Sequence, residues 1–72
     1  MSRIVALGEE KHVAPFAMVG VAVIAVDEAI AVRNAWSGLG DDVGLVILTR
    51  CAANALGPAL ETPGSPLWAV MS

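Results

Sequence analysis

Apolar residues in this chain gather into four short runs, and the charges, glycines and prolines lie mostly between them. The third run, Val43–Thr49, is a continuous apolar stretch rich in β-branched residues. A strand with one buried face alternates apolar and polar residues, whereas a strand buried on both faces reads as an unbroken apolar run. The pattern therefore predicts a central strand of a parallel sheet over Val43–Thr49.

Three further runs of the same character predict three more strands. They cover Arg3–Gly8, Val21–Val26 and Leu67–Met71. The segment between the first two strands begins with a polar connection at 9–12. Its apolar residues from Val13 to Val19 then have helical spacing. Proline is tolerated only in the first turn of a helix, so Pro15 makes this helix short.

The second connection, from Asp27 to Leu39, has the pattern of an amphipathic helix. Its apolar residues recur at the spacing of one helix face, which includes Val32 and Trp36, while Ile30 falls on the polar side. Asp27 is expected to cap its amino end. The third connection, 50–60, is again helical but weakened by Gly57-Pro58.

Strand and helix thus alternate three times before a final strand, which predicts one small α/β domain over residues 1–72. This order favours a parallel sheet with right-handed crossovers.

Composition narrows the class of protein. Of 72 residues, 57% are hydrophobic and only 15% are charged, so we expect part of the apolar surface to be buried against a partner. The net charge is −3 and the four basic residues are scattered, which argues against nucleic-acid binding. The longest uncharged run, Val13–Val26, is too short and too interrupted to span a membrane. No secretory signal is visible.

Few side chains suggest a catalytic or ligand-binding site. Gly8 ends a strand, but no phosphate-binding glycine motif follows it. Glu9 and Glu10 stand where a response-regulator receiver keeps its acidic pair, yet no aspartate ends the third strand to accept a phosphoryl group. Two carboxylates alone make a poor Mg²⁺ site, so we interpret this pair as a solvated loop.

The single cysteine, Cys51, excludes an internal disulfide and a Cys-rich metal site and favours a reducing compartment. Arg50 and a nearby helix start are features that activate thiols. The lone histidine, His12, could lie close by, but we expect it on a surface loop. A buried packing role is therefore expected for Cys51, and core positions for Trp36 and Trp68. No catalytic, cofactor-binding or metal-binding residue is predicted, and the chain is not expected to be an enzyme.

Several stretches resemble the small central-stalk subunit, designated F, of the archaeal and vacuolar (A/V-type) rotary ATPases. Those stretches are Ile4–Glu9, Phe16–Gly20, Val21–Ala29, Gly44–Thr49 and Pro66–Met71. Ala17 stands where the family usually has arginine, and Arg50-Cys51 replaces a common acidic pair. Relatives also usually continue into a further helix after the fourth strand, which this sequence lacks.

The resemblance implies a doubly wound, receiver-like sheet of four parallel strands in the order 2-1-3-4, with helices on both faces. It also implies a non-catalytic rotor subunit of the central stalk. Such a protein binds the coiled-coil stalk subunit, designated D, and possibly the catalytic subunits. It couples ATP hydrolysis or synthesis elsewhere in the complex to proton or sodium-ion transport. It would be cytoplasmic, peripheral to the membrane and not inserted in it.

Two alternatives remain open from the sequence. One is a degenerate receiver-like interaction module of another bacterial assembly, which predicts the same fold. The other, which we rank lowest, is a thiol enzyme that uses Cys51. In the 2-1-3-4 order, the first helix lies on one face and the other two lie on the opposite face. Part of the first face, over the third and fourth strands, is then left without a helix, and we expect a helix from another chain, or this chain's own missing tail, to lie there.

Overall fold

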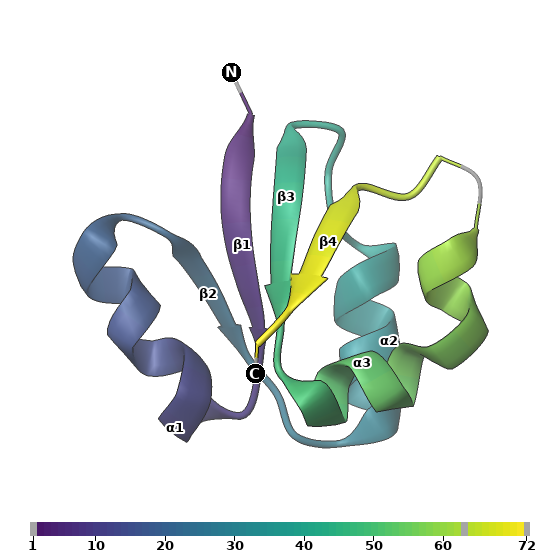
Figure 1. The fold of residues 1–72 in the computed structure, drawn as a ribbon, viewed down its shortest axis with the longest axis horizontal. Coiled ribbons are helices and arrows are strands. Elements are labelled where there is room, and N and C mark those ends of the chain that lie inside the picture. The colour runs from purple at the N-terminus through teal and green to yellow at the C-terminus, as the bar shows by residue number, and fades with distance from the viewer. Residues whose placement is uncertain (1, 63, 72) are drawn as a thin grey trace.

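Four parallel strands form a single sheet in the order β2-β1-β3-β4 in the computed structural model, which describes residues 2–62 and 64–71 (Figure 1). The strands are β1 (Arg3–Gly8), β2 (Ala22–Ala25), β3 (Val43–Leu48) and β4 (Leu67–Val70). The predicted fold class and strand order are confirmed. β3 is an inner strand, as its apolar run indicated, and β2 and β4 are the two edges.

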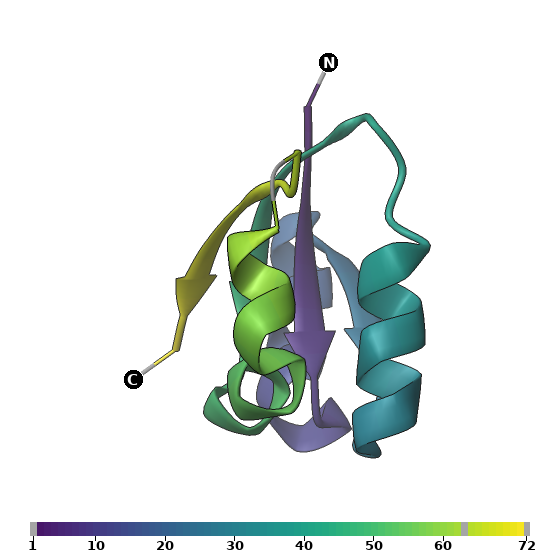
Figure 2. The same cartoon turned by 90° about the vertical axis from the view of Figure 1, so that its right-hand side faces the viewer.

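Helical segments connect the strands and lie on both faces of the sheet. The first connection holds α1 (Glu10–Val13) and a 3₁₀ segment, η1 (Ala14–Val19). The second holds α2 (Ala29–Ser37), and the third holds α3 (Arg50–Leu56) followed by a second 3₁₀ segment, η2 (Gly57–Glu61). Figure 2 shows α2 and α3 together on one side of the sheet, with α1 and η1 behind it.

The helix boundaries differ from those the sequence predicted. The first helix begins at Glu10 instead of Val13, and the part around Pro15 is 3₁₀ because proline lacks the N–H that an α-helical ladder needs. Asp27 does not cap α2: the capping residue is Glu28, and its side chain makes no capping bond. α3 ends at Leu56 and is capped by Gly57, which has a φ of 50°, and Pro58 lies in the first turn of η2. The predicted loop around Pro63 lies partly outside the described residues.

The hydrophobic core lies between the sheet and the pair α2 and α3. Register places Val5 beside Val46 and Leu7 beside Leu48, so these four side chains point to the same face. All four are fully buried, and they pack with Val32, Trp36, Ala52 and Leu56 from the two helices. Arg33 joins the helices at their surface, where its Nε donates to the carbonyl oxygen of Ala55 at 3.1 Å.

The opposite face is only half covered. α1 and η1 lie over β1 and β2, where Ala6 and Val13 are fully buried. No helix of the described residues covers the same face of β3 and β4, a coverage that agrees with the helix count made from the sequence (Figure 2). β3 is therefore fully buried on one face only, although its unbroken apolar run is the pattern of a strand buried on both faces.

Candidate functional site

Two regions of the described chain carry the features from which function can be argued. The first is a polar cluster at the carboxyl ends of β1 and β3, where receiver-like folds keep their chemistry. The second is the uncovered part of the sheet. Each contains residues that the sequence singled out.

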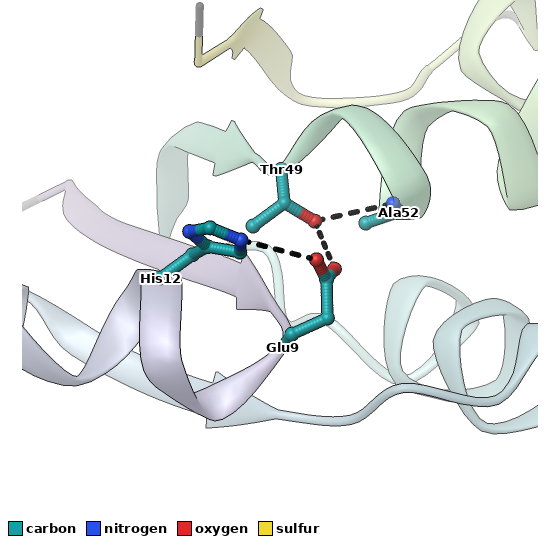
Figure 3. A network of polar contacts seen from close by, with 4 residues as sticks. All are labelled: Glu9, His12, Thr49 and Ala52. Carbon is teal, nitrogen blue, oxygen red and sulfur yellow. Dashed lines mark hydrogen bonds and ion pairs between the residues drawn. The ribbon is translucent and has the colours of Figure 1, made fainter.

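Thr49 is the centre of the polar cluster and is buried. Its Oγ1 donates a hydrogen bond to Oε1 of Glu9 at 2.5 Å and accepts one from the N–H of Ala52 at 3.2 Å (Figure 3). The second bond caps α3 at its amino end. Because Glu9 follows β1 and Thr49 follows β3, the pair ties two neighbouring strand ends together.

The close contact between these strand ends also explains Gly8. A Cβ atom at this position would collide with the side chain of Thr49, and the backbone there has a φ of 155°. Gly8 thus makes room for Thr49 at the point where β1 ends.

Glu9 is not the freely solvated residue that the sequence predicted. The hydrogen bond from Thr49 lowers the pKa of its carboxyl below the usual value, and a backbone hydrogen bond acts in the same direction. His12 lies on α1 instead of a loop, with its Nε2 at 3.7 Å from Oε2 of Glu9 (Figure 3). Glu10, by contrast, is exposed on α1.

Cys51 is exposed, so the prediction of a buried packing role was wrong. It shares a shallow hollow of about 180 Å³ with five other residues: Glu9, His12, Thr49, Arg50 and Met71. The structure therefore places His12 and Cys51 in one hollow, although no hydrogen bond or ion pair joins them among the described residues. The imidazole of His12 faces Glu9. The thiol of Cys51 therefore has no hydrogen bond to the imidazole that could act as its base.

The residues that the structure describes contain no group of three or more histidine, cysteine, aspartate or glutamate side chains able to hold a metal ion. Thr49 occupies the place of a receiver's phosphoacceptor, and its hydroxyl is engaged on both sides. The arrangement therefore fits a structural latch between β1, β3 and α3.

The uncovered part of the sheet is the second region. We call it the open face and define it by Ile4, Leu45, Ile47, Leu67 and Ala69, whose side chains alternate with those of the core. Leu67 is 75% exposed and Ile4 is 43% exposed, while Leu45 and Ile47 are half-buried.

Apolar residues of η1 extend this surface. Met18 is 90% exposed and Val19 is 74% exposed. Val19 and Ile4 line a common hollow of about 320 Å³ between η1 and the amino end of β1. At that end of the sheet an exposed ion pair joins Arg3 to Asp42 at 2.6 Å. The open face is thus an uncharged apolar surface with one polar pair at its rim.

Trp68 lies on the other side of β4. It was predicted to be a core residue, but 42% of its surface is exposed, so that prediction was wrong. Its indole Nε1 donates to the carbonyl oxygen of Leu60 at 3.2 Å, which holds η2 beside β4. Trp36, on α2, is buried as predicted.

No protein-family model and no curated protein matches the chain. In the described part of the chain, no helix has the length and apolar character needed to cross a bilayer.

Proposed function

We propose that this chain is a non-catalytic docking subunit that binds another protein through the open face. The observation that carries the proposal is the bare apolar surface over β3 and β4, on which Leu67 is 75% exposed. Parallel sheets are normally covered on both faces. A bare apolar surface of this kind marks a site of protein–protein contact.

The surface area of the chain supports the same interpretation. A compact monomer of 7.4 kDa is expected to expose roughly 4,200 Å², whereas this chain exposes 4624 Å². The excess is of the size that one covering helix would remove. Burying a few hundred Å² of apolar surface contributes several kcal/mol at about 25 cal/mol per Å², before the costs of association.

The resemblance to the small stalk subunit supplies a specific form of this proposal. In that form the chain is a rotor subunit in the central stalk of an A/V-type rotary ATPase and binds the coiled-coil stalk subunit. The open face suits such a partner, because one apolar helix stripe can lie beside η1 over β3 and β4. The chain would then be cytoplasmic and peripheral to the membrane, and would couple ATP hydrolysis or synthesis to ion translocation without an active site of its own.

Co-expression with the coiled-coil stalk subunit of the same host tests the proposal. We expect the two chains to co-purify. Leu67→Glu should abolish the complex, because it places a charge within an apolar interface. Ile30→Glu is the matched control, since Ile30 is 70% exposed on α2, on the other side of the sheet.

Loss of binding in Leu67→Glu with retention in Ile30→Glu would support the open face as the docking surface. Equal binding by both variants, each with the circular dichroism of the parent, would contradict it. Recovery of a different partner from the host, again sensitive to Leu67→Glu, would keep the docking role and replace the coiled-coil stalk subunit as the partner. That result would favour the receiver-like alternative.

A further inference from the structure

The outer edge of β4 has backbone groups that are free to pair with another strand. The N–H of Met71 donates to the carbonyl oxygen of Leu48 at 2.8 Å. In a parallel ladder the residues that bond to the neighbour alternate along the strand. Leu67 and Ala69 therefore also direct their backbone groups toward β3, and Trp68 and Val70 direct theirs outward.

Apart from its short length of four residues, β4 lacks the devices that usually protect an edge strand. Such strands carry lysine, proline or a bulge, or lie under a loop. β4 consists of Leu-Trp-Ala-Val, with all four residues exposed, and its pairing with β3 is regular. In Figure 2 it is the outermost element on its side of the described chain. The other edge, β2, is mostly half-buried.

We propose that β4 pairs in antiparallel fashion with β4 of a second copy of this chain, with Ala69 on the two-fold axis. Trp68 then lies opposite the partner's Val70, and Val70 lies opposite the partner's Trp68. Both positions direct N–H and C=O outward, so this register forms four backbone hydrogen bonds. Two four-stranded sheets become one sheet of eight strands.

The residues of β4 suit a second copy better than an unrelated strand. A two-fold contact requires a surface that is complementary to itself. Trp68 against valine is an aromatic and β-branched pair, which is favourable across antiparallel strands, and it occurs twice. The small side chain of Ala69 meets its own copy where the two strands approach most closely. A register centred on Trp68 or on Val70 would form only two backbone bonds within the strand.

The pairing uses the edge of the sheet and leaves the open face accessible, so it does not depend on the proposed function. A four-residue contact buries less than a stable dimer interface, which is about 1,200 Å² or more. The dimer is therefore weak, and its population depends on protein concentration.

Disulfide trapping tests the register directly. In a Cys51→Ser background, which removes the only native thiol, Ala69→Cys should form a covalent dimer under mild oxidation. Leu67→Cys is the matched control, because its side chain points to the same face and Leu67 is 75% exposed. In the proposed register the two copies of position 67 are offset by four residues, roughly 13 Å along the strands, which exceeds the reach of a disulfide of about 7 Å.

Rapid dimer formation by Ala69→Cys, several-fold faster than by Leu67→Cys, is the expected result. Equal rates for the two variants, or no dimer from Ala69→Cys, would overturn the proposal. Equal rates would indicate association through the open face, where both side chains lie.

Sedimentation velocity over a concentration series provides a second test, with Val70→Pro. Proline removes an outward N–H that the β3–β4 ladder does not use, and edge strands tolerate it. We expect the parent to shift from monomer to dimer with concentration and Val70→Pro to remain monomeric, with unchanged circular dichroism. A concentration-dependent dimer in folded Val70→Pro would count against the proposal. If the variant loses its circular dichroism, the trapping pair decides alone.

Discussion

The two faces of this sheet carry equally apolar side chains, yet helices cover only one face completely. On the face under α2 and α3, Val5, Leu7, Val46 and Leu48 are fully buried. On the other face, residues of the same types stand beside them in sequence, but α1 and η1 cover only β1 and β2. The difference lies in the number of helices available to each face. An apolar run thus specifies a strand whose faces can both be buried. Whether a face is buried depends on how many of the connecting helices lie on it.

The largest expected effect comes from truncating one leucine on each face. Leu48→Ala should lower the free energy of unfolding by about 2–5 kcal/mol, because it leaves a cavity in the closed core. That loss is a large part of the stability of a small domain, so much of the protein should be unfolded. Leu67→Ala should change the free energy of unfolding by less than about 0.5 kcal/mol.

Urea unfolding followed by circular dichroism would measure both values. Similar losses for the two variants would mean that the open face contributes to the core of the isolated chain, and the contrast between the faces would fail.

An intermediate effect is expected at the latch between the strand ends. Thr49→Val keeps the shape of the side chain but removes the hydroxyl, which leaves the buried N–H of Ala52 and the carboxylate of Glu9 without this partner. The loss of unfolding free energy should be about 1–3 kcal/mol. Thr49→Ser keeps the hydroxyl and should retain most of the polar contribution. A smaller loss in Thr49→Val than in Thr49→Ser would show that the methyl group matters more than the hydrogen bonds.

The smallest effect is a pH dependence at Glu9. Its pKa is lowered in the folded chain from an ordinary value of 4.5, mainly by the hydrogen bond from Thr49. A lowered pKa stabilises the fold above the ordinary value, and the stabilisation is lost as the pH falls through the lowered value. Glu9→Gln can still accept the hydrogen bond but does not titrate.

The stability difference between the parent and Glu9→Gln should therefore shrink between pH 6 and pH 3, by an amount on the order of 1 kcal/mol. Unfolding curves at a series of pH values would measure it. A difference that is constant with pH would show that the carboxylate charge does not contribute.

Local patterns in the sequence were sufficient to predict the positions of the strands and the face of α2 that is buried. Each apolar run became a strand, and the helical spacing of Val32 and Trp36 correctly marked the side that packs on the sheet. Order 2-1-3-4 came from the resemblance to the small stalk subunit, because apolar pattern alone does not specify which strands are neighbours. The half-covered face followed from that order and a count of helices.

Features that depend on contacts distant in sequence were missed. Glu9 and Thr49 are 40 residues apart, and neither has a local signal for their hydrogen bond. Their positions after two neighbouring strands were the available clue. Cys51 was expected to be buried because cysteine usually is, but in the first turn of α3 it faces the hollow at the strand ends. Asp27 failed as a cap because α2 begins later, after Glu28.

Hydrogen exchange on the open face tests the central claim most directly. The backbone amides of Leu45–Leu48 and Leu67–Val70 should be compared in the isolated chain and in the complex with the coiled-coil stalk subunit. Protection should rise on these two strands and stay unchanged on α2, which lies on the closed face. Equal protection of β3 and β4 in both states, with the complex formed, would show that the open face is not the docking surface.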